Sequence, residues 1–347
     1  MTSNFDNRLL DAGRRGLRRK WRRVAVSGAL ASMAVGSVAC GASSTPSSSA
    51  VTSPKSITIA FVPGTTTNPF YISMEAGAKS EAAKLGVNLV WQGSTTWSAS
   101  AQTPVVDALL AQHPSALVIV PTDETAMKGP IQQFVNAHIP VVAADTTISD
   151  TSLLQSQITG DNSLGGKQAA DTLASLIHET GQVAIIDNEP GVTTDDARQS
   201  GFGQEIAAKY PNISIVATEY DAESPTTAAS QTAALLLAYP QLAGIFAIDT
   251  PTGEGVGTAL QEAKAIGKVF AVAYDASAEE ATLLKSGALS ALVMQQPALE
   301  GATAVQYAYD LVAGHKSEVK SFVLLPNIIA TTATANDPNI SKYYYGV

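Results

Sequence analysis

Three aspartates stand where short apolar runs end. Asp145, Asp249 and Asp275 each close a run with the character of a buried strand. Parallel strands place their carboxyl ends along one edge of a sheet, and ligands bind there. Ionised carboxylates are strong acceptors for hydroxyl hydrogens. The three aspartates therefore predict a site for a hydroxyl-rich solute, although each of them could instead cap the helix that follows it.

Arg198 is the only arginine after Cys40. Its planar guanidinium presents two parallel donors that can span adjacent hydroxyl groups, which lysine cannot do. Asn68 and Gln295 offer both amide donors and amide acceptors, so we place them in the same site. An ion pair within its own helix, with a nearby aspartate of the Asp195-Asp196 pair, is the alternative role for Arg198.

Aromatic side chains lie near the same strand ends. Phe70, Tyr71 and Tyr220 supply flat faces for the apolar side of a sugar ring, and Trp91 or Trp97 adds another. A neutral, polyhydroxylated ligand therefore fits the predicted set of residues.

Two glycine-rich segments imitate nucleotide-binding loops. Gly253-Glu254-Gly255-Val256-Gly257 would need a glycine where Thr258 stands. Gly165-Gly166-Lys167 has Asp161 in place of the first glycine of a phosphate-binding loop and Gln168 in place of its Ser or Thr. We therefore expect no nucleotide cofactor.

The histidines give no sign of catalysis or metal binding. His113, His138, His178 and His315 lie near expected helix ends or loops, without metal-ligand spacing and without a nearby nucleophile. We expect no metal site, no catalytic residue and no enzymatic activity.

Apolar runs and amphipathic stretches alternate from residue 56 onward. The expected strands are 57–62, 87–91, 116–120, 141–144, 155–159, 183–186, 213–218, 244–248 and 269–273. The expected helices include 70–85, 126–137, 166–177, 228–238 and 255–265. This order is typical of right-handed βαβ units with parallel sheets. About ten such units exceed one open sheet, so we predict two doubly wound α/β lobes, with the passage into the second at Gly160-Asp161-Asn162.

The first forty residues have the pattern of an export signal. A basic region that includes Arg14-Arg15 precedes the apolar stretch 24–39, which is too short for a membrane span. Ser37-Val38-Ala39-Cys40-Gly41 resembles a bacterial lipobox, although Ser37 stands where leucine is usual. We expect residues 1–39 to be removed, Cys40 to be lipidated, and residues 40–55 to be a Ser/Thr/Pro tether. The sequence leaves open whether export uses the twin-arginine or the general route.

The charge changes sign along the chain. Eight Lys or Arg and two Asp precede Cys40, which leaves 13 basic and 28 acidic residues after it out of totals of 21 and 30. So acidic a surface repels phosphate backbones, and nucleic-acid binding is not expected.

The order of several motifs resembles the ribose- and galactose-type periplasmic binding proteins over residues 56 to about 334. These motifs are Asn68-Pro69-Phe70-Tyr71, Pro121-Thr122-Asp123, Gly160-Asp161-Asn162 through Lys167, Arg198 through Phe202, Tyr274-Asp275 and Gln295-Gln296-Pro297. The resemblance implies the type I fold, in which a three-strand hinge joins the lobes. It implies a first lobe of residues 56–160 and 296–323, a second of 161–295 and 324–334, and a tail of 335–347.

The resemblance also implies the partners. A neutral sugar or sugar alcohol would be clamped between the lobes of a monomer and delivered to a membrane permease of the ATP-binding cassette (ABC) type. The protein would be held at the outer face of the cytoplasmic membrane through Cys40.

Two departures from ribose binders bear on the ligand. Thr146 stands where those proteins have arginine, and Asp249 stands where they have asparagine. Both changes remove donors, which points away from ribose toward another pentose, a hexose or an alditol. Three aspartates beside one arginine disfavour an anionic sugar.

Three other functions compete with this one. A receptor for a furanosyl signalling compound such as autoinducer-2 would resemble the same fold with a different pocket. A sugar-responsive transcription regulator would need an N-terminal helix-turn-helix, whose place the signal and tether take. An enzyme on this scaffold would need a nucleophile, a metal set or a cofactor loop.

Overall fold

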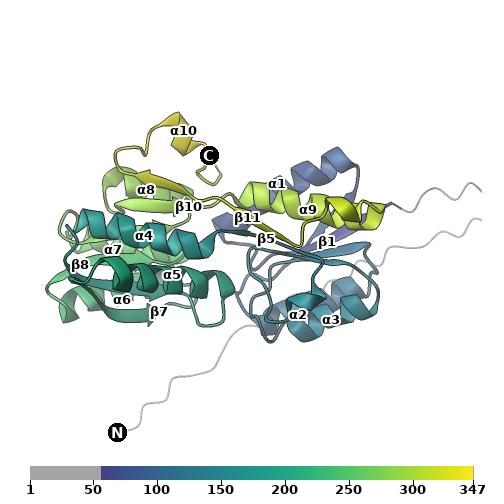
Figure 1. Cartoon of the computed structure of the whole chain (residues 1–347), viewed down its shortest axis with the longest axis horizontal. Coiled ribbons are helices and arrows are strands. Elements are labelled where there is room, and N and C mark those ends of the chain that lie inside the picture. The colour runs from purple at the N-terminus through teal and green to yellow at the C-terminus, as the bar shows by residue number, and fades with distance from the viewer. Residues whose placement is uncertain (1–55, 347) are drawn as a thin grey trace, which may run out of the picture. The chain divides into compact units, whose positions relative to one another are not determined.

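The structure is a computed structural model that describes residues 56–346. The predicted signal peptide, Cys40 and the tether to residue 55 lie outside the described residues. Residues 56–346 form two α/β lobes, each built on one six-stranded sheet (Figure 1). The predicted two-lobed α/β fold is confirmed.

The first lobe holds a parallel sheet in the order β11-β5-β4-β3-β1-β2. Its strands are β1 (Thr58–Val62), β2 (Asn88–Trp91), β3 (Ala116–Ile119), β4 (Val141–Ala144), β5 (Ser156–Gly160) and β11 (Phe322–Leu325). Its helices are α1 (Pro69–Leu85), α2 (Ala99–Leu110), α3 (Lys128–Asn136) and α9 (Pro297–Ala313), with 3-10 turns at Thr151–Leu153 and Lys316–Glu318. Helices α1 and α9 cover one face of the sheet, and α2 and α3 cover the other (Figure 1). Alternate residues of β1 therefore enter different cores, as the period of two along a strand requires.

The second lobe holds a mixed sheet in the order β12-β10-β9-β8-β6-β7. Its strands are β6 (Gly181–Asp187), β7 (Ile213–Tyr220), β8 (Leu242–Ala247), β9 (Phe270–Tyr274), β10 (Ala291–Met294) and β12 (Ile328–Thr331). Its helices are α4 (Asn162–Leu176), α5 (Thr193–Lys209), α6 (Pro225–Ala238), α7 (Thr250–Glu262), α8 (Ala278–Ser286) and the short α10 (Pro338–Ser341). Residues of α4 and α5 pack on one face, and those of α6, α7 and α8 pack on the other.

One edge strand departs from the parallel arrangement. β12 pairs antiparallel with β10. It follows β11 of the first sheet after only Pro326 and Asn327. The carboxyl ends of the two sheets face each other, so a chain that leaves the first sheet at that end enters the second sheet at its carboxyl end. It must then run against the other strands.

The chain passes between the sheets three times. The passages follow β5, β10 and β11. The third lies after Leu325, two residues beyond the boundary that the resemblance implies.

Local sequence determines where α1 begins and ends. The Asn68 side chain accepts a hydrogen bond from the backbone N–H of Phe70 at 2.9 Å, and Pro69 fits the first helical turn. Gly86 ends the helix in the left-handed conformation with φ 66°. Asn68 and Pro69 thus fix the start of α1, and Gly86 fixes its end.

No helix within residues 56–346 is long and apolar enough to cross a membrane.

Helices α4 and α5 pack together through glycines. A methyl group on Gly201 would overlap the backbone carbonyl oxygen of Ser163, whereas a methyl group on Gly203, in the same helix, would meet nothing within 4 Å. The first glycine is therefore needed for close approach, and the second is not.

We expect opposite effects from two alanine substitutions in α5. Gly201→Ala should lower the free energy of unfolding by about 1–3 kcal/mol, because it forces α4 away. Gly203→Ala should raise it by about 0.5–1 kcal/mol, since alanine loses less backbone entropy in a helix. Urea unfolding followed by circular dichroism measures both, and a Gly201→Ala variant as stable as the wild type would contradict this packing.

Candidate functional site

A cavity lies between the carboxyl ends of the two sheets. Its walls are Asn68, Phe70, Tyr71, Trp97 and Asp145 from the first lobe, and Val192, Thr194, Asp195, Arg198, Glu223, Asp249, Asp275 and Gln295 from the second lobe and its hinge. Nine of the eleven predicted ligand-binding residues are among them.

Asp145 and Asp275 occupy matching positions in the two lobes. Each follows the last residue of a strand, β4 or β9, and each has a positive φ, 61° and 81°. The backbone N–H of each donates to the next strand, to the carbonyl of Ile158 and of Val293, both at 2.8 Å. Positive φ is uncommon for a non-glycine residue and costs about 1–3 kcal/mol, which the surrounding structure must offset. The same strained turn therefore places one carboxylate on each side of the cavity.

Asp145 is held by the first lobe. Its Oδ2 accepts from the Tyr71 hydroxyl at 2.7 Å, and its backbone N–H also donates to Glu300 Oε1 at 2.8 Å. Burial raises the pKa of the Asp145 carboxyl to about 6, although the Arg198 charge and the Tyr71 hydroxyl oppose the shift. Additional donors from a ligand would relieve this cost of burial.

Asp275 is held by three donors. Its Oδ1 accepts from Gln295 Nε2 at 2.8 Å and from the Tyr345 hydroxyl at 3.0 Å. Its Oδ2 accepts from the Thr250 hydroxyl at 2.9 Å. The carboxylate therefore has a fixed orientation.

Arg198 is buried in the second lobe, where it forms the intrahelical ion pair and also lines the cavity. Its Nη1 donates to Asp195 Oδ1 at 2.9 Å and to the Ile248 carbonyl at 3.0 Å, and its Nε donates to Asn162 at 2.8 Å. The guanidinium carbon lies 3.9 Å from the centre of the Tyr274 ring. Burial alone would lower the pKa of Arg198, but the carboxylates around it, Asp195 first, raise it, so the group stays charged. The ion pair thus fixes a guanidinium on the cavity wall.

Asp249 also has two roles. Its Oδ1 caps α7 by accepting from the Thr252 N–H at 3.0 Å and from the Thr252 hydroxyl at 2.6 Å. Its Oδ2 is buried and has no hydrogen-bond partner among residues 56–346. That oxygen is available for a ligand hydroxyl.

The aromatic wall comes from the first lobe. Phe70 and Tyr71 meet edge to face with ring centres 5.1 Å apart, and Tyr71 stacks on Trp97 at 6.2 Å. The buried Trp97 Nε1 has no partner among the described residues, so it adds a donor to this apolar face.

Tyr220 and Trp91 do not line the cavity. Tyr220 is 43% exposed, and its carbonyl accepts from Gln231. Trp91 packs on Phe61 with ring centres 4.4 Å apart. They end β7 and β2, the edge strands of their sheets, which lie furthest from the central strands. Ligand contact by these two residues stays a prediction, which their positions outside the cavity lining do not support.

The loop after β7 supplies a cavity residue that was not predicted, and the loop after β2 supplies Trp97, one of two predicted alternatives. Glu223 follows β7, and Asn68 Nδ2 donates to its Oε2 at 3.4 Å across the lobes. Burial raises the pKa of the Glu223 carboxyl, and the nearby Asp249 adds to the shift. Asp195, Thr194 and Val192 also line the cavity. An acidic residue in a strand-end loop is the signal that would have identified Glu223.

The histidines lie away from the site, as expected. His113, His138, His178 and His315 each stand two or three residues after a helix ends, and the first three have a positive φ. No cluster of metal-binding side chains was found within residues 56–346.

Comparison with known proteins gives consistent matches. Residues 59–316 match the family model described as a periplasmic binding protein domain. The ribose import binding protein RbsB of Salmonella typhimurium is 33% identical over 274 residues, which cover 78% of this chain and 90% of that protein. The D-allose-binding periplasmic protein of Escherichia coli is 26% identical, with coverages of 77% and 89%.

Solved structures agree with these sequence matches. An ABC transporter solute-binding protein from Agrobacterium vitis, bound with α-D-tagatopyranose, superposes with a TM-score of 0.81 at 33% identity, covering 84% of this chain and 100% of that one. A carbohydrate transporter solute-binding protein from Agrobacterium radiobacter, in complex with D-arabinose, gives 0.80 at 31%, with coverages of 84% and 99%. With its two facing sheets and the cavity between them, the chain belongs to the periplasmic binding protein family, among the ribose- and galactose-type proteins of the type I fold.

Proposed function

We propose that this protein is an exported solute-binding protein that captures a neutral monosaccharide or sugar alcohol between its lobes. It then delivers the ligand, as a monomer, to an ABC importer. The family consists of solute-binding proteins rather than enzymes. The observation that supports the proposal most is a cavity between the lobes with five carboxylates, one guanidinium and an aromatic wall.

The hydrogen-bonding groups favour a ligand with many hydroxyls. Asp249 Oδ2, Gln295 Oε1 and Trp97 Nε1 are buried without partners among residues 56–346, so two acceptors and one donor of the cavity-lining residues are unpaired. Hydroxyl groups both donate and accept, so one polyol serves both. The rings of Phe70 and Tyr71 offer an apolar surface for its C–H groups.

The charges favour a neutral ligand. The cavity contains Asp145, Asp195, Asp249, Asp275 and Glu223 against Arg198 alone. Arg198 is already paired with Asp195, so a ligand carboxylate or phosphate would face unbalanced negative charge.

The ligand need not be ribose. Thr146, at the position where ribose binders have arginine, turns its hydroxyl to the carbonyl of Pro121 and does not line the cavity. Relatives and neighbours are described as binding ribose, allose, arabinose or tagatose. No observation in residues 56–346 specifically favours the furanosyl signalling compound.

We expect a thermal-shift screen to identify the ligand. The panel is D-ribose, D-allose, D-arabinose, D-tagatose, ribitol, arabinitol and galactitol. At a hundredfold its Kd, a true ligand should stabilise the fold by about 2.7 kcal/mol and raise the Tm. Failure of every neutral panel member, together with a rise in Tm caused by acidic sugars, would contradict the proposal.

Affinity for the ligand should fall at acidic pH, because Asp145 accepts a hydrogen bond from a ligand hydroxyl only while it is ionised. Its raised pKa of about 6 means that affinity is full above this pH and falls as the pH drops through it. Asp145→Asn should bind more weakly and lose this part of the pH dependence. Titration calorimetry from pH 5 to 8 measures the effect.

Asp150→Asn is the matched control. Hydrogen bonds from Ser152 lower the pKa of this exposed aspartate, so its loss should change neither affinity nor the profile. An Asp145→Asn variant that keeps the wild-type pH profile would show that Asp145 is not the titrating acceptor.

We also propose that Cys40 anchors the protein at the outer face of the cytoplasmic membrane. The mature N-terminus should be an acylated Cys40, detected by mass spectrometry of membrane fractions. Cys40→Ser should remove the protein from that fraction, and Ser43→Ala, in the tether, should not. A mature chain that begins with unprocessed Met1 would rule out this anchor.

A further inference from the structure

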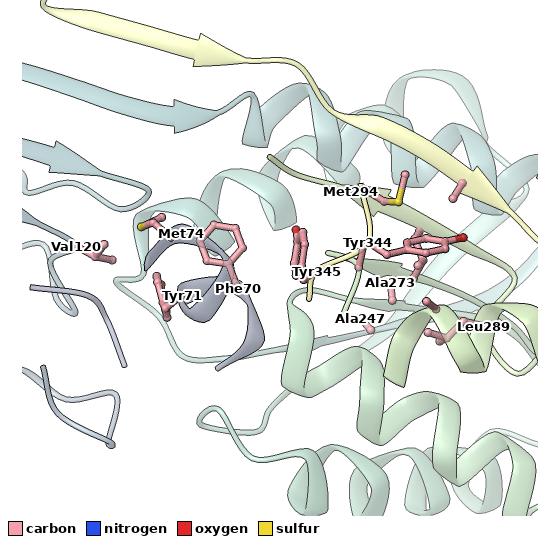
Figure 2. Packing of buried hydrophobic residues seen from close by; sticks show 14 of the residues in the cluster. Phe70, Tyr71, Met74, Val120, Ala247, Ala273, Leu289, Met294, Tyr344 and Tyr345 are labelled. Carbon is pink, nitrogen blue, oxygen red and sulfur yellow. The ribbon is translucent and has the colours of Figure 1, made fainter. Parts of the chain in front are cut away.

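Tyr345, beyond α10, has a side chain buried beside the sugar cavity. The ring is 4% exposed, and Figure 2 shows it between Phe70 and the Tyr344 region of the second lobe. Tyr345 does not itself line the cavity, but it contacts two residues that do, Phe70 and Asp275. The sequence did not predict Tyr345 as a site residue, because it does not follow the end of a predicted strand.

The backbone of this segment is attached to the second lobe. The Tyr345 N–H donates to the Ala276 carbonyl at 2.8 Å. The neighbouring Tyr344 is buried near Met294, donates its hydroxyl to the Ala335 carbonyl at 2.8 Å, and has Lys285 Nζ 5.3 Å from its ring centre. Movement of the second lobe therefore moves Tyr345 with it.

The hydroxyl of Tyr345 restrains Asp275. It donates to Oδ1, the oxygen that also accepts from Gln295 Nε2. Two donors occupy both lone pairs of Oδ1, whereas Oδ2 accepts from Thr250 alone. Oδ2 therefore keeps a free lone pair for a ligand hydroxyl, in an orientation that Tyr345 helps to set.

The ring of Tyr345 reaches the first lobe. It meets Phe70 of α1 edge to face, with ring centres 5.9 Å apart and an interplanar angle of 73°. This contact joins the second-lobe segment to the aromatic wall of the first lobe. Because the two residues belong to different lobes, separation of the lobes would break this contact, whereas the bond to Asp275 lies within the second lobe and would survive.

We propose that Tyr345 is a positioning residue of the sugar site, which orients Asp275 and, on closure, latches the second lobe to Phe70. The inference rests on the proposed function, since it concerns how that site holds its ligand. Tyr345 would slow ligand release without touching the ligand.

Two substitutions separate the two contacts. Tyr345→Phe removes the bond to Asp275 and keeps the ring, so Kd should rise about 3- to 10-fold. Tyr345→Ala also removes the contact with Phe70, so Kd should rise further, through faster dissociation with an association rate within about twofold. The ligand is the panel sugar or alditol with the largest thermal shift, measured by titration calorimetry and stopped-flow fluorescence.

Tyr344→Phe is the matched control. It removes the buried hydrogen bond from the Tyr344 hydroxyl to the Ala335 carbonyl in the same segment, and leaves the contacts with Asp275 and Phe70 in place. Its Tm should fall about as far as that of Tyr345→Phe, whereas its Kd should stay within about twofold of the wild type.

The outcomes distinguish the two proposals. If the wild type binds and Tyr345→Phe binds equally well, or if Tyr344→Phe weakens binding as much, the positioning role is overturned and the proposed function stands. If the wild type binds no panel member, the proposed function fails and this inference falls with it.

Discussion

The ion pair between Arg198 and Asp195 is the interaction on which the site depends. Both groups are buried on α5, and removing one partner of such a pair leaves an uncompensated charge at a cost of about 3–5 kcal/mol. Asn162, the Ile248 carbonyl and the Tyr274 ring complete the setting of the guanidinium. The pair therefore holds a rigid donor beside four further carboxylates. This arrangement leaves acceptors in excess, which suits hydroxyl groups and opposes anions.

The fold supplies the other residues of the site by bringing the carboxyl ends of the two sheets together. Asp145 and Asp275 end corresponding strands in the same strained conformation, so each lobe presents a carboxylate to the other. Two helix-capping residues lie at the same ends of the sheets, since Asn68 caps α1 and Asp249 caps α7. Residues that begin helices thus also line the cavity. The three passages between the lobes permit opening without breaking either sheet.

Much of the fold and part of the site could be predicted from the alternation of short apolar runs with amphipathic stretches. The predicted strands and helices are present, because buried parallel strands read as short apolar runs between amphipathic helices. Asp145, Asp249 and Asp275 were found by their position after such runs. Tyr220 and Trp91 do not line the cavity, and no local pattern reveals that β7 and β2 are edge strands. Glu223 follows the end of a strand, as the three aspartates do, whereas Tyr345 follows no strand, and only the tertiary structure brings it beside the cavity.

The central claim is that the cavity binds a polyol because the polyol is uncharged and carries many hydroxyl donors. The most direct measurement compares the best alditol with the aldonate of the same carbon skeleton, which is open-chain like the alditol, by titration calorimetry at pH 8. The two ligands then differ mainly by one terminal carboxylate. The account predicts that the aldonate binds at least about 100-fold more weakly, a penalty of about 2.8 kcal/mol. Equal or tighter binding of the aldonate would contradict it.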